Sequence, residues 1–407
     1  MQTSMFAFAT DLADEGVEAV LDNVHGRAGL DEVTLGVAYH DARDIFPHNP
    51  VRTVRYLEGG AVFFRPGNER YEGLRLQPHP SALARTGDPL GELCEAAEHR
   101  GMGVNAWMVF LHNDRLGFDH PECATQNALG DRYLTDLCPA NPDVRAYVRA
   151  LASDVAGYGV SNIFAESLHF HGLGHGYHHE RYFEDIGSVG AFMLGLCFCE
   201  YCLEAAGRAG VDAAAVHRAV REDLRRRLDN GAPEGDSGEI TRELVESFAG
   251  EKVLAYSDAR EQTVNSLADE VSVAAGKTLV AFLDLSGAEK GFATGKPEGG
   301  ATVEIGWRIG VDAASLSTVC DRLVVAGYAA DPSRLAFDLD AYQERIPDVS
   351  KLGLLLRPMP PDCRSAENLA AKVDLARGRG FERLDFYHYG FCRLNALDWV
   401  RRSLSGA

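Results

Sequence analysis

The sequence predicts an α/β chain that folds as one (β/α)₈ barrel of the TIM type. Three observations favour this class: eight short apolar runs bounded by turn residues, helical patterns between most of them, and near-continuous apolar character within each run. Parallel sheets covered on both faces need such strands, and eight strands alternating with helices fit a barrel better than an open sheet. The 407 residues, 46% hydrophobic, suffice for one barrel or two smaller domains. The order of elements favours the barrel.

The predicted strands follow one another along the chain with helices between them. A helical pattern at 16–25 separates the first two strands, and a helix that begins in the segment NPDVRAYV leads into the fourth. Helical patterns also separate most of the later strands. The eight strands are expected at 5–10, 33–39, 103–111, 162–170, 278–285, 322–328, 351–358 and 383–389.

Three connections are too long to be simple crossovers, and they follow strands two, four and five. They cover 41–102, 171–277 and 286–321. Long loops after barrel strands build the functional face of this fold. We therefore expect a single domain over 1–407, in which 171–277 forms a long helical insertion that includes a cluster of cysteines.

Composition excludes several classes of function. A formal net charge of −20 opposes a nucleic-acid surface, which needs clustered Lys and Arg. No stretch approaches the roughly 20 apolar residues of a membrane span. The first residues lack the basic segment of a secretory signal, so a cytoplasmic location is expected. In that compartment thiols stay reduced, and nine cysteines indicate metal binding or burial rather than disulfides.

Three of the nine cysteines lie within the six residues CFCEYC at 197–202. Thiolates bind zinc when four converge tetrahedrally, and this C-x-C-x-x-C segment supplies Cys197, Cys199 and Cys202. The best fourth ligand is Cys138, in the turn LCPANPDVR before strand four, and Cys123 is the alternative. The competing interpretation is that the three cysteines pack as small apolar residues at the start of a helix.

This arrangement resembles the catalytic domain of the glycoside hydrolase family 42 β-galactosidases and related clan A barrels. The segments LCPANPDVR, NIFAESLHF and CFCEYC occur in the family's order with comparable spacing, over roughly residues 100–205. The resemblance implies a glycosidase-like hydrolase and a structural Zn²⁺ bound by Cys138, Cys197, Cys199 and Cys202. Such a site has no open position for water and stabilises the long loop.

Glu166, inside NIFAESLHF, matches the family's general acid/base glutamate. Apolar neighbours flank it in the strand, so partial burial should raise its pKa and let it donate a proton near neutral pH. The alternative is a buried ion pair with an arginine from a neighbouring strand. The family's nucleophilic glutamate at the end of strand seven has no counterpart, because Arg357 and Pro358 occupy that region.

Another acid must therefore supply the second carboxylate that glycoside hydrolysis requires. Asp284, at the end of strand five, is the first choice because that strand adjoins strand four in the barrel. Asp11, Asp385 and Glu304 are further candidates, although Asp11 and Asp385 are more often structural at such positions.

Polar aromatic and basic residues gather at the expected strand ends, where they suit the hydroxyls and faces of a sugar ring. Histidines are especially frequent in SLHFHGLGHGYHHER, which contains His169, His171, His175, His178 and His179. The predicted substrate-binding residues are Tyr39, His40, Trp107, His112, His169, His171, Tyr328, Arg357, Tyr387 and His388.

Three functional hypotheses follow. The first is a hydrolase that acts on a small saccharide or glycoside through Glu166 and Asp284. The second is a barrel that binds carbohydrate without hydrolysing it, and the third is a metal-dependent hydrolase that uses His169 and His171 as ligands. The expected partner is a small carbohydrate, with no nucleic acid and no membrane, and a homo-oligomer is compatible with the sequence.

Overall fold

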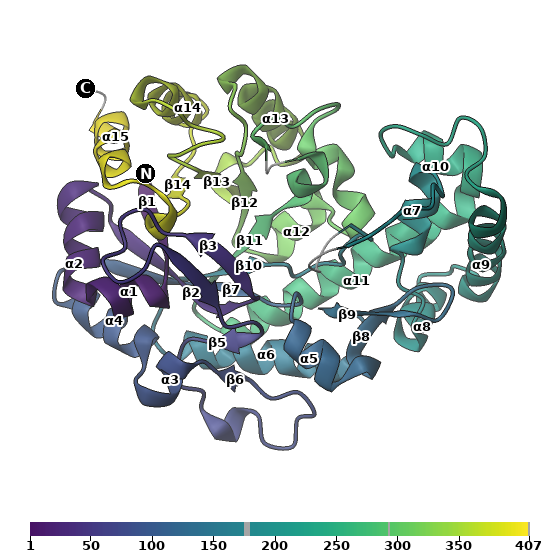
Figure 1. Ribbon diagram of the computed structural model, residues 1–407, viewed down its shortest axis with the longest axis horizontal. Helices are drawn as coiled ribbons and strands as arrows, with labels where there is room; N and C mark the ends of the chain where they lie inside the picture. Colours follow the sequence, from purple (N-terminus) through teal and green to yellow (C-terminus); the bar gives the residue numbers. More distant parts are fainter. Residues whose placement is uncertain (175–179, 292–293, 406–407) are drawn as a thin grey trace.

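The computed structural model describes residues 1–174, 180–291 and 294–405, and it contains the predicted closed barrel (Figure 1). Eight parallel strands pair in the order β1-β2-β7-β10-β11-β12-β13-β14, and β14 pairs with β1 to close the ring. The strands are β1 (Gln2–Phe8), β2 (Glu32–Tyr39), β7 (Gly103–Val109), β10 (Asn162–Glu166), β11 (Leu279–Asp284), β12 (Arg322–Ala326), β13 (Leu352–Leu356) and β14 (Arg383–Phe386).

Helices cover the outside of the barrel, and several begin at a signal that is visible in the sequence. The side chains of Asn141, Asp331 and Asp88 accept hydrogen bonds from the first turns of the helices that follow, and a proline opens each of these helices. The surrounding helices are α1 (Ala9–Glu15), α2 (Val17–Leu21), α4 (Pro89–Glu98), α6 (Pro142–Ala156), α11 (Glu251–Ala275), α12 (Ala313–Val319), α13 (Pro332–Arg345), α14 (Ala366–Gly378) and α15 (Leu394–Ser405).

Aromatic rings fill the middle of the barrel. Phe6 contacts both Trp107 and Phe164 edge-on, each at 5.2 Å between ring centroids. Below them, Arg383 donates to Asp385 at 2.7 Å and pairs with Glu32 at 2.6 Å. Asp385 therefore belongs to a buried charge network near the start of the strands, which agrees with the structural role expected for it.

The three long connections carry secondary structure of their own. The connection after β2 contains β3 (Ala42–Ile45), β4 (Val54–Leu57), β5 (Ala61–Val62), β6 (His79–Pro80) and α3 (Ala82–Thr86). The connection after β11 contains a 3-10 helix at Thr302–Ile309 and α12. A fourth excursion, after β7, was not predicted: it contains α5 (Asp114–Asp119) and the hairpin of β8 (Ala124–Gln126) and β9 (Arg132–Leu137).

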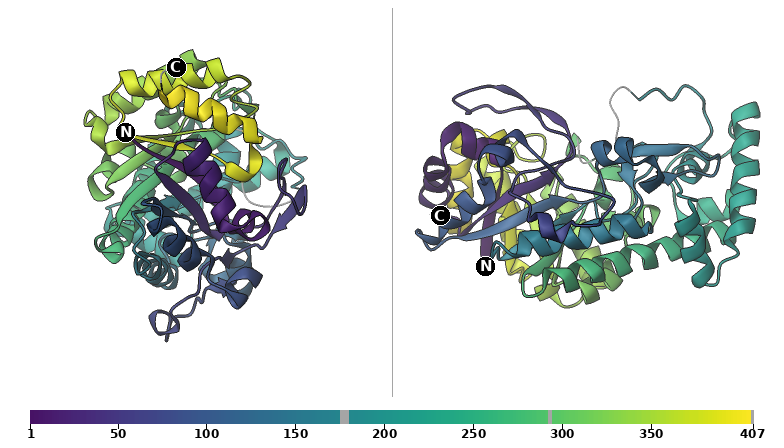
Figure 2. Two further views of the ribbon diagram at one scale, coloured as in Figure 1. Left: turned by 90° about the vertical axis from the view of Figure 1, so that its left-hand side faces the viewer. Right: turned by 90° about the horizontal axis from the view of Figure 1, so that it is seen from below.

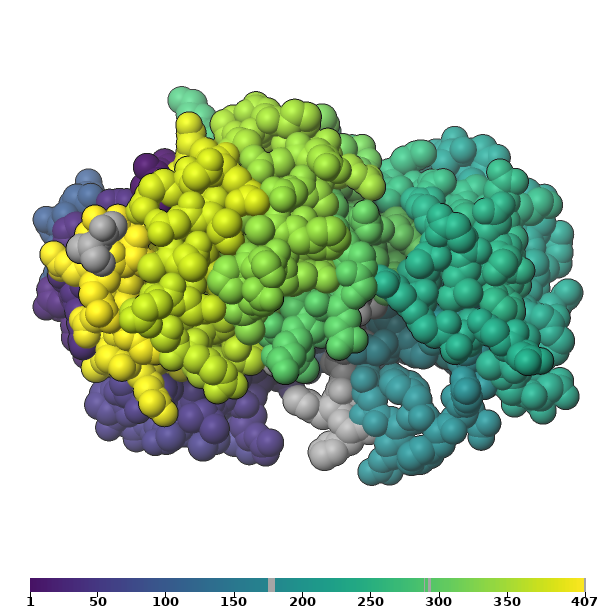
Figure 3. Space-filling view, turned by 90° about the horizontal axis from the view of Figure 1, so that it is seen from above, coloured from purple at the N-terminus to yellow at the C-terminus, as the bar shows by residue number. Residues whose placement is uncertain are grey.

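The insertion after β10 contains α7 (Ser188–Leu194), α8 (Glu200–Arg208), α9 (Ala213–Asn230), α10 (Arg242–Ala249) and the start of α11. It projects beside the barrel as a separate lobe (Figures 2 and 3). Val189, Met193, Leu224, Val245 and Tyr256 contribute to a hydrophobic core of its own. The long helix α11 belongs to both parts, since it packs on α6 of the barrel and on α8 of the insertion.

Most strands end earlier than the apolar runs suggest. Strand four was expected over 162–170, yet β10 ends at Glu166 because Ser167 adopts a positive φ of 52° that breaks the strand. Within the described ranges, the structure contains no helix long and apolar enough to span a bilayer.

Candidate functional site

Glu166 is the last residue of β10 and lies at the carboxyl-terminal end of the barrel. Its backbone carbonyl accepts a hydrogen bond from Phe110 at 3.0 Å, so the main chain is fixed beyond the end of β7. The indole Nε1 of Trp107 donates to Glu166 Oε2 at 2.5 Å. Burial raises the pKa of Glu166 to about 7, although the Trp107 hydrogen bond opposes the shift. Glu166 is therefore part protonated near neutral pH.

Aromatic residues from other strands surround Glu166. Tyr39 lies 4.8 Å from Trp107, Tyr387 lies 5.7 Å from Trp107, and Tyr328 lies 6.0 Å from Tyr387, all between ring centroids. Burial raises the pKa of all three tyrosines, and the charge of Glu166 adds to each shift. Four of the predicted binding residues, Tyr39, Trp107, Tyr328 and Tyr387, thus form one cage around Glu166, with neutral phenols as donors and acceptors.

Strand seven carries an ion pair at the position of the missing glutamate. Arg357, directly after β13, donates to Asp362 through Nε at 2.5 Å and through a terminal nitrogen at 2.7 Å. Its guanidinium also lies 4.0 Å from the centre of the Tyr328 ring. Arg357 thus joins the cage. It also holds Asp362, the next carboxylate along the chain, in a bidentate ion pair.

Asp284 is buried at the end of β11, and its carboxylate has several partners. It accepts from the backbone nitrogen of Ser286 at 2.8 Å, from the Ser286 hydroxyl at 2.5 Å and from Tyr342 on α13 at 2.7 Å. These contacts hold the carboxylate toward its own loop and the helix layer. They favour a structural role, and the catalytic assignment of Asp284 stays a prediction.

The other two acids proposed from the sequence lie in different surroundings. Asp11 is fully buried at the start of α1, where it accepts from Phe8 N at 2.9 Å, and burial raises its pKa to about 7. Glu304 lines a cavity of about 540 Å³ between the insertion and the segment 300–314, together with Arg242, Glu261 and Trp307. Neither acid contributes to the described shift of the Glu166 pKa.

Four of the predicted histidines form a second wall at the ends of β2, β7 and β10. His40 stacks on His112 at 4.5 Å, His112 lies 5.8 Å from His171, and His171 lies 5.0 Å from His169. Burial lowers the pKa of His169 and of His171, so both are neutral near pH 7. His169 donates through Nδ1 to the carbonyl of Phe170 at 2.6 Å, which leaves Nε2 as an acceptor.

One residue of this wall, Asp136, was not predicted from the sequence. Asp136 on β9 lies 3.0 Å from Nδ1 of His171, and both side chains are buried. It belongs to the unpredicted hairpin after β7, and only the pairing of its strand brings it here. His388 lies behind the aromatic cage instead, fully buried, 4.1 Å from Phe8 and 6.0 Å from Trp107 between ring centroids. His175, His178 and His179 lie outside the described residues.

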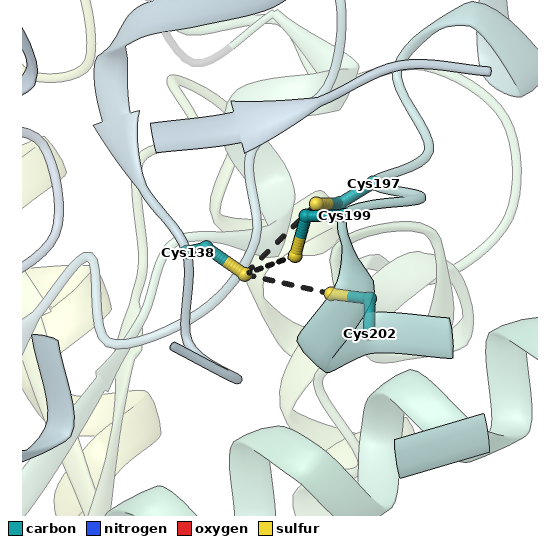
Figure 4. A group of neighbouring side chains, drawn as sticks. All are labelled: Cys138, Cys197, Cys199 and Cys202. Atoms are coloured by element: carbon teal, nitrogen blue, oxygen red, sulfur yellow. Dashed lines mark hydrogen bonds between the residues drawn. The ribbon is translucent and has the colours of Figure 1, made fainter. Parts of the chain in front are cut away.

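The cysteine cluster forms as predicted, between the turn before α6 and the start of α8 (Figure 4). Cys138 Sγ lies 3.9 Å from the sulfur of Cys197, 3.5 Å from that of Cys199 and 3.4 Å from that of Cys202. Four sulfurs about 2.3 Å from a tetrahedral Zn²⁺ are about 3.8 Å apart, whereas disulfide sulfurs are about 2.05 Å apart. The geometry fits a metal site, and Cys123 lies outside the cluster.

The histidine wall does not form a comparable site. Among the residues that the structure describes, the four cysteines are the only group of His, Cys, Asp or Glu side chains whose ligand atoms lie close enough together to bind one metal ion. The hypothesis of a hydrolase with a metal on His169 and His171 therefore lacks geometric support.

Comparison with solved structures finds other proteins with a similar fold. No family model matches the chain, and no curated protein matches it by sequence. A β-galactosidase from the psychrophilic Marinomonas ef1 superimposes with a TM-score of 0.57 at 11% identity, over 100% of this chain and 59% of that protein. The catalytic domain of a β-amylase from Paenibacillus polymyxa gives a TM-score of 0.52 at 11% identity, over 98% and 94% of the two chains. At such low identity, the similarity establishes the (β/α)₈ fold alone.

Proposed function

We propose that this protein hydrolyses a glycosidic bond of a small saccharide or glycoside, with Glu166 as the general acid. The observation that carries the proposal is the position of Glu166 at the end of β10, where burial raises its pKa to about 7 inside a cage of aromatic rings. A carboxylic acid with that pKa can protonate a leaving oxygen near neutral pH, and such proton transfer contributes about 10²- to 10⁴-fold in rate.

The surrounding side chains support binding of a sugar ring. Tyr39, Tyr328 and Tyr387 place phenol groups around Glu166, and their hydroxyls can exchange hydrogen bonds with a sugar. The indole of Trp107 also fixes the Glu166 carboxyl in one orientation. The histidine wall adds neutral imidazoles that exchange hydrogen bonds with sugar hydroxyls, and Arg357 adds one cation.

We further propose that Cys138, Cys197, Cys199 and Cys202 bind a structural Zn²⁺. Four thiolates leave no position for a water or substrate, so the metal would stabilise the fold without taking part in the reaction. It would connect the turn before α6 to the start of α8 and so anchor the insertion to the barrel.

A second candidate function is carbohydrate binding without hydrolysis. One specific observation favours it: strand seven ends in Arg357, whose guanidinium is paired with Asp362, instead of an available carboxylate. Without a second carboxylate, protonation by Glu166 alone leaves the attacking water without a base.

The test compares the wild type with Glu166→Gln on a panel of alkyl α- and β-glycosides, whose leaving groups need a proton, while calorimetry measures binding of the corresponding free sugars. Hydrolysis by the wild type that falls at least about 10²-fold in the variant, with sugar affinity retained, supports the proposal. Sugar binding with no turnover by the wild type supports the binding protein instead. Equal turnover by the two proteins contradicts a role for Glu166.

A further inference from the structure

The face of α11 beside the cysteine cluster carries an arginine. Tyr256 and Arg260 are four residues apart on α11, so their side chains share one face of the helix. Tyr256 donates to the backbone carbonyl of Cys197 at 2.6 Å. Cys202, Tyr256 and Arg260 line one narrow cavity between α8 and α11. Arg260 therefore lies next to the site that the four thiols form.

Arg260 is buried without an acidic partner. Its exposed fraction is 3%, and its neighbour Glu261 pairs with Arg242 instead, at 3.6 Å. Among the residues that the structure describes, Arg260 has no ion pair with a carboxylate, and its Nε has no hydrogen-bond partner. A buried cation normally has an opposite charge beside it, because removal of an ion from water is costly. The negative charge beside Arg260 must come from a group other than a carboxylate.

The cysteine cluster supplies that charge when it holds a metal. Metal binding requires the thiols to lose their protons. Four thiolates around one Zn²⁺ carry a net negative charge, whereas four protonated thiols carry none. The main chain also favours a thiolate at one ligand, since Gln126 N donates to Cys197 Sγ at 3.2 Å. Arg260 is therefore compensated in the metal-bound state of the protein.

Arg260 also contacts the loop that follows β10. Its guanidinium lies 4.4 Å from the centre of the Phe170 ring, and its Nη1 donates to the carbonyl of Arg308 at 3.0 Å. Phe170 lines the same narrow cavity as the cysteine cluster and stands between His169 and His171 in the chain. Arg260 thus connects the cluster to the segment that carries two histidines of the wall.

We propose that Arg260 is the counter-ion of the metal-loaded cysteine site and holds the loop after β10 against it, an inference that rests on the proposed zinc site. The charge of the loaded site fixes the guanidinium, and the guanidinium fixes the Phe170 ring through a cation–π contact. Loss of the metal leaves Arg260 uncompensated and weakens the attachment of this loop. The metal then orders the mouth of the barrel as well as the insertion.

The experiment measures zinc affinity, by competition with a chromogenic chelator, for the wild type, Arg260→Met, Arg260→Lys and Arg242→Met. Methionine is a flexible apolar replacement, and lysine keeps the charge. Arg242→Met is the matched control, because Arg242 also lies over an aromatic ring, 5.1 Å from the centre of Trp307, but pairs with Asp258 at 2.8 Å. We expect Arg260→Met to bind zinc about 10- to 100-fold more weakly than the wild type. Arg260→Lys should lie closer to the wild type than to Arg260→Met, and Arg242→Met should equal the wild type.

Melting temperatures with and without zinc separate charge compensation from packing. In the zinc-free protein, Arg260→Met removes an uncompensated buried cation, so this variant should melt no lower than the zinc-free wild type. At zinc concentrations that saturate both proteins, the same variant should melt below the wild type. A simple packing defect would lower both melting temperatures and would contradict the counter-ion role.

Hydrogen–deuterium exchange of residues 167–173 tests the link to the loop. Zinc-loaded Arg260→Met should exchange faster there than the zinc-loaded wild type, because the contact with Phe170 is lost. Exchange in α14, which belongs to another part of the barrel, should be the same in both proteins.

Distinct results separate this inference from the zinc proposal. A wild type that binds no zinc overturns both. A wild type that binds zinc, together with equal zinc affinity in Arg260→Met, overturns the role of Arg260 and leaves the zinc site intact. Equal exchange of residues 167–173 in the two zinc-loaded proteins overturns the link to the loop.

Discussion

Replacement of one cysteine in the cluster should remove the metal and loosen the insertion. In Cys199→Ser, a hard hydroxyl replaces one of four thiolates, and zinc binds such a set far more weakly. The zinc would cross-link Cys138 to Cys197, which are 59 residues apart. Closing a loop of that length removes about 4 kcal/mol of chain entropy from the unfolded state, by the relation used for covalent cross-links.

That loss converts into a measurable shift of the melting temperature. For the 407 residues of this chain, an unfolding entropy of about 2.1 cal/mol/K per residue gives about 0.85 kcal/mol/K. Division of about 4 kcal/mol by this value predicts a decrease of about 5 °C. The assay combines atomic-emission measurement of zinc per chain with scanning calorimetry of the wild type, Cys199→Ser and a chelator-treated wild type.

Cys123→Ser is the matched control, because Cys123 is buried beside the cluster, and its backbone carbonyl accepts from Cys138 N at 2.8 Å. It should keep about one zinc per chain, as four-thiolate sites do. Two results would contradict the zinc proposal. One is a wild-type protein that carries no zinc after purification in a zinc-containing buffer. The other is a Cys199→Ser variant that keeps its full zinc content and an unchanged melting temperature.

Two further predictions concern Glu166. Trp107→Phe removes the hydrogen bond that lowers the pKa of Glu166, so the basic limb of the pH profile of kcat/KM should move to higher pH. Trp399→Phe is the control. Coincident pH profiles for the two variants would contradict an effect of Trp107 on the pKa of Glu166. Because folding raises the pKa of Glu166 from 4.5 to about 7, its ionisation destabilises the folded state progressively across that interval. Glu166→Gln should therefore gain stability over the wild type between about pH 5 and about pH 8, by up to about 3 kcal/mol, in denaturant titrations at both pH values. An advantage that does not grow with pH would be inconsistent with the raised pKa.

The barrel was predictable because its strands are buried on both faces and so appear as continuous apolar runs. Runs such as VTLGVAY and KLGLLLRP can bury both faces only in a covered parallel sheet, and β2 and β13 form there. The cysteine cluster was predictable because three thiols within six residues are more typical of metal ligands than of core packing. The ends of the strands could not be predicted in the same way, because a single backbone angle at Ser167 decides where β10 stops.

The hairpin of β3 and β4 and the hairpin of β8 and β9 were missed, and with the second of them Asp136. Their strands, ARDI and RYLTDL, are short and interrupted by charged and polar residues, so they lack the apolar character on which the strand assignments relied. Asp284 was chosen by strand order alone, which does not reveal that Tyr342 and Ser286 engage its carboxylate.

The role of Glu166 as a general acid is tested most directly by the leaving-group dependence of Glu166→Gln. The kcat/KM of the variant and of the wild type would be compared on a dinitrophenyl glycoside, whose leaving group needs no proton, and on an alkyl glycoside of the same sugar, whose leaving group does. A loss of about 10²- to 10⁴-fold on the alkyl glycoside, with little loss on the dinitrophenyl glycoside, is the predicted result. Equal losses on both substrates would contradict proton donation by Glu166.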